Sequence, residues 1–110
     1  MEMNKPAVHL YTTDEHLPSL PEICAGLEEE GVPWKLIQTE GSAEELAWRA
    51  AQDSVLETGI GVTRQAAALQ ISRVPKERPV FLFANPTADQ SRALGTNAAR
   101  AVKKRRFVET

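Results

Sequence analysis

Cysteine is almost absent from this chain of 110 residues, which contains Cys24 alone. A single cysteine cannot build an internal disulfide framework, so we expect a protein of the reducing cytoplasm. Long apolar runs are also missing, since no stretch approaches the roughly 20 residues that span a bilayer. Residues 1–6 have no apolar core of the kind found in signal peptides. The formal net charge of −2 argues against a general attraction to nucleic acid, so a specific partner must be recognised through a local surface.

The composition is that of an ordinary globular domain. Hydrophobic residues make up 42% of the chain and charged residues 25%, close to the averages for such domains, which argues against disorder. A length of 110 residues suits one compact unit with one core. We therefore expect residues 1–110 to form a single domain without an internal repeat or linker.

Runs of β-forming residues alternate with helical apolar stripes along the chain. The predicted strands are residues 8–11, 34–38, 58–62, 66–71 and 80–84. The predicted helices are residues 20–30, a segment that follows Ser42, and residues 88–103. This alternation predicts an α/β fold with a mostly parallel sheet of about five strands flanked by helices. The third and fourth strands lie too close for a crossover helix, so we expect them to be antiparallel neighbours in a mixed sheet.

Local signals refine this prediction. Ser19 with Glu22 and Ser42 with Glu45 both have the spacing of a capping box, which starts a helix. The apolar run at residues 80–84 predicts a fully buried strand. The inward residues of the last helix are predicted to be Leu94, Ala98, Ala101 and Val102.

Three glycines call for an interpretation. Gly59 and Gly61 invite comparison with a dinucleotide fingerprint, but Arg64 stands where the third glycine belongs and no helix is predicted to follow. We favour the interpretation that this strand passes close beneath a helix. Gly95 lies inside the last predicted helix, where it should weaken that helix by about 1 kcal/mol relative to alanine.

Residues that could carry catalysis do not converge in the sequence. Cys24 falls on the apolar stripe of the first helix, where a cysteine usually behaves as a small buried hydrophobe. His9 lies in the first strand and His16 in the loop after it, and no metal-ligand spacing accompanies them. We therefore expect no catalytic residue, and no cofactor bound by this chain alone.

Two charged clusters and one aromatic residue are candidates for binding. Glu28, Glu29 and Glu30 stand at the predicted end of the first helix, where the helix dipole disfavours carboxylates. A solvated helix end is the common explanation; the alternative is a carboxylate offered to a basic partner or to a magnesium ion completed by another chain. The basic residues 103–106 fit an ordinary helix end. Trp48 lies off the alanine stripe of the second helix and is either an interface anchor or a structural residue.

Four segments of the chain resemble the small subunits of diol and glycerol dehydratase-reactivating factors, a family related to the medium subunits of the B12-dependent dehydratases. The segments are GLEEEGVP at residues 26–33, AAQDSVLETGIG at 50–61, VPKERPVF at 74–81 and GTNAARAVK at 95–103. Their order and spacing cover most of the chain and are more specific than any one segment. The departures are a divergent first strand and the residues 53–55, Asp-Ser-Val, where the family commonly has Ser-Ser-Pro.

The resemblance implies a role in subunit exchange. In this family a large subunit with an ATPase domain, which holds ATP or ADP, carries the small subunit, and two of each are expected in the complex. The small subunit gives way to the medium subunit of a dehydratase whose cobalamin is damaged, and the dead cofactor is released. Glu29 matches the glutamate that completes a magnesium site on the large subunit. From the residues themselves, Glu28, Glu30 and Trp48 are the expected interface residues. The resemblance does not distinguish a diol from a glycerol dehydratase as the target.

Two other hypotheses stay open at this point. The chain could be a structural medium-type subunit of a B12-dependent dehydratase, although such subunits usually carry further segments. It could also be an unrelated α/β accessory binding module. An independent enzyme is disfavoured because the sequence has no nucleophile, metal cluster or phosphate loop. The expected location is the cytoplasm, with association with a bacterial microcompartment left open.

Overall fold

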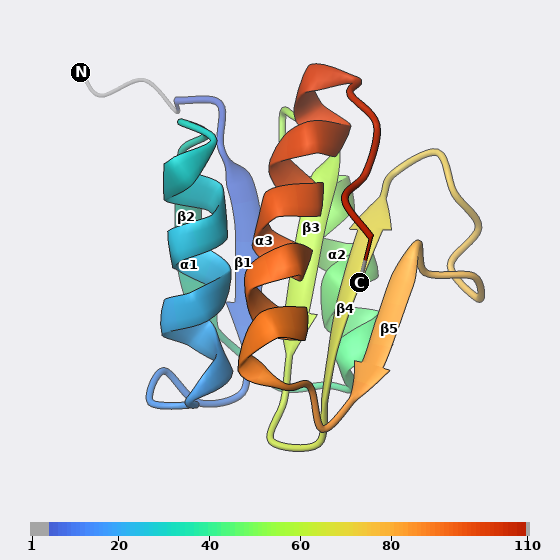
Figure 1. The fold of residues 1–110 in the computed structure, drawn as a ribbon. Helices are drawn as coiled ribbons and strands as arrows, with labels where there is room; N and C mark the ends of the chain where they lie inside the picture. The colour runs from blue at the N-terminus through green and yellow to red at the C-terminus, as the bar shows by residue number, and fades with distance from the viewer. Residues whose placement is uncertain (1–4, 110) are drawn as a thin grey trace.

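The fold is a five-stranded mixed sheet covered by three helices, as seen in a computed structural model that describes residues 5–109 (Figure 1). The elements in chain order are β1 (Val8–Thr12), α1 (Ser19–Glu29), β2 (Trp34–Gln38), α2 (Ala43–Asp53), β3 (Thr58–Val62), β4 (Ala66–Ile71), β5 (Phe81–Ala84) and α3 (Ala88–Lys103). The sheet order is β2-β1-β3-β4-β5. Strand β1 runs parallel to both of its neighbours, and β4 runs antiparallel to both of its own. The predicted α/β class, the strand number and the antiparallel β3–β4 pair are therefore confirmed.

The three helices divide between the two faces of the sheet. Helices α1 and α3 cover one face side by side, and α2 covers the other (Figure 1). The chain moves from β1 to the outer strand β2 through α1 and then returns across β1 to β3 through α2. Because parallel crossovers are right-handed, connections that move in opposite directions across a sheet place their helices on opposite faces. Among residues 5–109, no helix has the length and apolar character needed to cross a membrane.

Each face of the sheet has its own apolar layer. Beneath α1 and α3 lie large aliphatic side chains that are fully buried, including Leu10, Ile23, Leu27, Ile60 and Leu94. The layer beneath α2 is built mainly from small residues, among them Ala43, Ala47, Ala50 and Ala68. This difference allows α2 to approach the sheet closely.

The glycines of β3 make that close approach sterically feasible. A Cβ atom built on Gly59 would lie 2.2 Å from the backbone nitrogen of Ala51, and one on Gly61 would lie 2.2 Å from the carbonyl oxygen of Ala43. Any larger residue would therefore push α2 away from the sheet. The strand continues into a short turn and β4 without a helix, so the dinucleotide comparison fails and the close-packing interpretation is confirmed.

Glycine has the same role between α1 and α3, which the sequence analysis missed. A Cβ on Gly95 would lie 2.0 Å from the carbonyl oxygen of Ile23, and one on Gly26 would lie 2.4 Å from the carbonyl oxygen of Arg92. Gly95 is therefore a contact point between two helices and not merely a weak position in one.

Helix starts differ in part from the prediction. Helix α1 begins at Ser19 with Pro18 as its N-cap and no side-chain cap, so the first predicted capping box was wrong. Ser42 does cap α2, because its hydroxyl accepts a hydrogen bond from the Glu45 amide at 3.1 Å. A complete capping box is found at α3, between Thr87 and Gln90.

Two predictions about burial were wrong at the C-terminal end of the chain. Strand β5 is an edge strand and not a fully buried one, and its Leu82 is 46% exposed. In α3, Ala101 and Val102 are only half-buried, whereas the polar Asn97 is fully buried. Asn97 is buried because the segment that follows α3 turns back along the sheet beside this helix (Figure 1).

Candidate functional site

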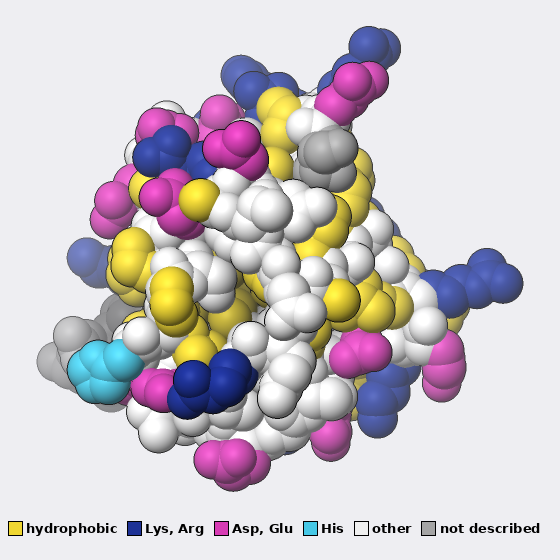
Figure 2. All heavy atoms as spheres, turned by 60° about the horizontal axis from the view of Figure 1, so that its bottom comes forward, with side chains coloured by type: hydrophobic (Ala, Val, Ile, Leu, Met, Phe, Trp, Pro, Cys, Tyr) yellow, Lys and Arg dark blue, Asp and Glu magenta, His cyan; other side chains and the backbone are white. Residues whose placement is uncertain are grey.

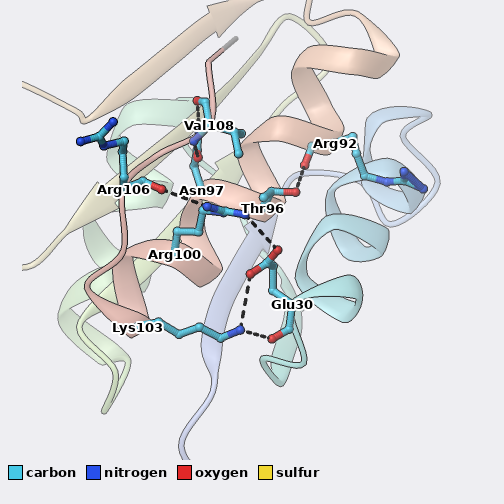
Figure 3. A network of polar contacts seen from close by, with 8 residues as sticks. All are labelled: Glu30, Arg92, Thr96, Asn97, Arg100, Lys103, Arg106 and Val108. Atoms are coloured by element: carbon cyan, nitrogen blue, oxygen red, sulfur yellow. Dashed lines mark hydrogen bonds and ion pairs between the residues drawn. The ribbon is translucent and has the colours of Figure 1, made fainter.

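The three glutamates at the end of α1 have different surroundings. Glu30 is the C-cap residue, and its side chain is only 18% exposed. Its carboxylate lies 3.6 Å from Arg100 Nη2 and 3.4 Å from Lys103 Nζ, and Lys103 Nζ also donates to the Glu30 carbonyl oxygen (Figure 3). Two cations from α3 therefore offset the unfavourable dipole at the end of α1. The Glu30 carboxylate is therefore paired with cations of this same chain.

Glu29 faces solvent and pairs with a different cation. Its side chain is 59% exposed, and its Oε2 atom lies 3.4 Å from Arg92 Nη1. The same guanidinium reaches back along α1, where its Nε lies 3.5 Å from Glu22 Oε1. In Figure 3 the Arg92 side chain extends away from the Glu30 cluster toward α1. Glu28 is also exposed, so the outward carboxylates of the triplet are Glu28 and Glu29.

The Glu29 carboxylate is exposed and has Arg92 as its ion-pair partner, and the described residues do not surround it with further metal ligands. No group of three or more His, Cys, Asp or Glu side chains that could hold a metal occurs among residues 5–109. Magnesium in proteins is often bound through one or two carboxylates, with water and phosphate oxygens as the other ligands. An exposed carboxylate such as that of Glu29 fits one such position, provided that the other ligands come from elsewhere.

Trp48 lies far from these glutamates. It is partly buried on α2, which covers the opposite face of the sheet from α1. The ammonium nitrogen of Lys76 lies 5.0 Å from the centroid of its ring, a cation–π contact that ties the β4–β5 loop to α2. The structure therefore does not bring the predicted interface residues together on one face. A partner that touches both sets would have to reach around the sheet.

Cys24 behaves as a small hydrophobe. It is half-buried in α1 and packs against the main core. Burial, with a smaller contribution from the Glu28 charge, raises the pKa of the Cys24 thiol to about 11. A thiol with that pKa is almost entirely protonated near neutral pH and is a poor nucleophile, which agrees with the structural role expected for Cys24.

A polar cluster that the sequence analysis missed links β1 to the end of α2. The Tyr11 hydroxyl donates a hydrogen bond of 2.5 Å to Asp53 Oδ2, and His9 Nδ1 lies 3.3 Å from the same hydroxyl oxygen. Burial and the Asp53 hydrogen bond raise the pKa of Tyr11 to about 12, while burial and the Lys35 charge lower the pKa of His9. Tyr11 and Asp53 are 42 positions apart, so no local pattern could have joined them. The neighbouring Ser54 hydroxyl donates to the Ala7 carbonyl oxygen at 2.6 Å and is not poised as a nucleophile.

The carboxyl ends of the parallel strands, where α/β proteins often bind ligands, carry no catalytic set either. Figure 2 turns this end toward the viewer and shows hydrophobic side chains among charges of both signs. Arg64 and Asp14 form an exposed ion pair of 3.8 Å across it. A shallow hollow of about 310 Å³ beside Arg64 is lined by Leu17, Pro18, Ser19, Thr63, Asn85 and Pro86.

Comparison with known proteins gives a consistent result. The family model described as dehydratase medium subunit matches residues 5–108. The propanediol dehydratase-reactivating factor small subunit of Citrobacter freundii is 33% identical over 108 residues, which are 94% of this chain and 92% of that protein. A solved structure of a diol dehydratase-reactivating factor complexed with ADP and Mg²⁺ aligns with a TM-score of 0.89 and 30% identity, covering 96% of this chain and all of that one.

A second solved structure, described as glycerol dehydratase reactivase, aligns with a TM-score of 0.87 and 34% identity, over 96% of this chain and 98% of that one. The match to the family model spans nearly the whole chain, and the aligned relatives are matched over almost their full length. The fold and the resemblance noted from the sequence therefore agree. The chain belongs to the dehydratase medium-subunit family and, within it, is similar to the small subunits of diol and glycerol dehydratase-reactivating factors.

Proposed function

We propose that this chain is the small subunit of a reactivating factor for a diol or glycerol dehydratase and that it exchanges places with the medium subunit of that enzyme. The observation that carries this proposal is a double similarity. The family is described by its dehydratase medium subunits, while the relatives aligned over most of the chain are reactivating-factor small subunits. Two proteins with one fold can compete for one surface, which is the requirement for exchange.

The partner in this proposal is a large subunit that holds ADP or ATP, with two large and two small subunits in the complex. Support comes from the related reactivating factor whose structure is described as complexed with ADP and Mg²⁺. When the large subunit releases this chain and takes the dehydratase medium subunit instead, the dehydratase opens and damaged cobalamin leaves. Nucleotide state biases the two competing equilibria, because a ligand shifts a population only by its differential affinity for the two states.

In this proposal the chain itself performs no catalysis, and the ATPase activity belongs to the large subunit. Within the described part of the chain, Cys24 is held protonated and Ser54 is bonded to a backbone carbonyl. The complex would act in the cytoplasm, or in a bacterial microcompartment where its target enzyme resides in one.

Glu29 is the residue that we assign to a magnesium site shared with the large subunit. Its carboxylate is exposed at the end of α1, and it supplies one anionic oxygen ligand. Glu28 is exposed beside it and is proposed as a second contact of the same interface. Glu30 is paired with Arg100 and Lys103, and its proposed part in the interface is to fix the end of α1 that carries Glu29. Trp48 is a further candidate contact on the opposite face of the sheet.

The experiment that tests the exchange is co-purification of this chain with the large subunit encoded beside it, in magnesium with ADP or ATP. Purified dehydratase is then added, and the composition of each complex is followed by size-exclusion chromatography. We expect a stable complex that releases this chain when dehydratase is added with ADP. Absence of a complex with either nucleotide would overturn the proposal.

Site variants make the same experiment specific. Glu29→Gln should weaken binding of the large subunit in magnesium, whereas Glu15→Gln, in the exposed loop between β1 and α1, should not. Trp48→Ala tests the opposite face, and an unchanged affinity would remove Trp48 from the interface.

A second candidate function is a structural medium-type subunit of a dehydratase, and the description of the family favours it. It predicts a stable complex of this chain with the remaining dehydratase subunits in the absence of any reactivating factor. The two functions are therefore separated by which partner retains the chain.

A further inference from the structure

Arg92 of α3 lies between two carboxylates of α1. Its Nη1 atom is 3.4 Å from Glu29 Oε2, and its Nε atom is 3.5 Å from Glu22 Oε1. Glu22 and Glu29 stand two turns apart along α1, so their side chains project on the same side of the helix. The Arg92 Nε atom is buried and makes no hydrogen bond of normal geometry. The guanidinium is thus held by charge between two acceptors and is not locked to either one.

We propose that Arg92 is an internal competitor for the cation that Glu29 binds, an inference that rests on the role assigned to Glu29 above. In the free chain the Arg92 guanidinium is paired with the Glu29 carboxylate. A magnesium ion must displace the guanidinium before it can bind that carboxylate. Glu22 gives Arg92 a second anion to pair with when Glu29 turns to the metal. The cation site is therefore kept neutral until a partner supplies the other ligands.

Helices α1 and α3 are also joined by contacts that do not involve the Arg92 side chain. Helices α1 and α3 meet through backbone contacts at Gly26 and Gly95, where an added Cβ would lie 2.4 Å or less from a carbonyl oxygen. Replacing the guanidinium leaves those contacts in place. A substitution at Arg92 should therefore change the charge beside Glu29 while α1 and α3 stay in contact.

The expected effect is small but measurable. The Arg92 and Glu29 side chains are 41% and 59% exposed. Exposed ion pairs of this kind are weak, so loss of the guanidinium should lower the magnesium concentration needed for assembly by about two- to fivefold. Loss of Glu22 should act in the opposite direction, because Arg92 would then pair with Glu29 alone.

The test measures the magnesium concentration at half-maximal complex formation between the full chain and the large subunit with ADP, by sedimentation velocity. The variants are Arg92→Gln, Glu22→Gln, Glu29→Gln and the double variant R92Q/E29Q. Arg105→Gln is the control, because it removes an exposed arginine beyond the end of α3. Thermal unfolding checks that each variant is folded; if Arg92→Gln is not, the increase expected for Glu22→Gln carries the test.

We expect a decrease for Arg92→Gln, an increase for Glu22→Gln and no change for Arg105→Gln, with no magnesium dependence in either variant that lacks Glu29. If Glu29→Gln abolishes the magnesium dependence but neither Arg92→Gln nor Glu22→Gln shifts it as stated, the competitor role of Arg92 is wrong and the role of Glu29 stands. If Glu29→Gln retains the wild-type magnesium dependence, both are wrong.

Discussion

The side-chain amide of Asn97 pairs with the backbone of Val108 in both directions. Asn97 Oδ1 accepts a hydrogen bond from the Val108 amide at 2.7 Å, and Asn97 Nδ2 donates one to the Val108 carbonyl oxygen at 3.2 Å. The preceding residue, Phe107, packs edge-on against Phe81 of β5, with ring centroids 5.4 Å apart. A fully buried amide in α3 thus holds the C-terminal segment over the part of the sheet that the helices leave open.

Asn97→Ala should lower the free energy of unfolding by about 2–3 kcal/mol, because it removes two hydrogen bonds and leaves a gap at a buried position. Urea denaturation measures the change. The control is Thr96→Ala at the adjacent half-exposed position, whose hydroxyl bonds the Arg92 carbonyl oxygen within the same helix. A loss for Asn97→Ala no larger than that for Thr96→Ala would mean that Asn97 does not hold the segment.

Gly95→Ala should destabilise the protein, although the same change stabilises an isolated helix by about 1 kcal/mol. The new methyl group would lie 2.0 Å from the carbonyl oxygen of Ile23, so α1 and α3 must separate. We expect the free energy of unfolding to fall by about 2 kcal/mol or more, the size of effect that an overpacked core produces. Thermal unfolding measures it. Ala101→Gly, at a half-buried position of α3, is the control for helix propensity, with a smaller contribution from the lost methyl group. Stabilisation by Gly95→Ala would disprove the close helix contact.

The single tyrosine of the chain permits a direct optical titration. The pKa of Tyr11 is raised to about 12, first by burial and then by the hydrogen bond to Asp53. Because the folded pKa exceeds the usual value of 10.0, the stability linked to this proton is fully present below pH 10 and is lost as pH rises toward 12. Absorbance of tyrosinate should show a midpoint near 12 in the folded protein, and Asp53→Asn should lower it. A midpoint near 10 in the folded protein would contradict the buried hydrogen bond.

The single cysteine gives a second spectroscopic handle. With a thiol pKa of about 11, Cys24 should react with a disulfide reagent at pH 8 far more slowly than the same thiol in urea, because only the thiolate is reactive. Glu28→Gln should increase the rate only slightly, since burial is the larger cause of the shift and the Glu28 charge the smaller one. Equal rates in the folded and unfolded chain would show that Cys24 is solvated.

The pattern of residues along the chain determined the order and kind of its elements. Period-2 and helical spacing are local properties, and they located five strands, three helices and the antiparallel β3–β4 pair. They also placed Glu28, Glu29 and Glu30 at one helix end. The family resemblance came separately, from four sequence segments at residues 26–33, 50–61, 74–81 and 95–103. The small residues of β3 and α2 indicated a close contact that the structure confirms at Gly59 and Gly61.

Only the tertiary structure decided how side chains distant in the sequence share their charges and their burial. Arg92 pairs with Glu29, and Arg100 and Lys103 pair with Glu30. Local spacing does not predict these ion pairs, because they form across the contact between α1 and α3. The sequence also did not show that β5 lies at the edge of the sheet. An apolar run has the same sequence in the centre of a sheet and at its edge, and the burial of each strand depends on which elements pack beside it.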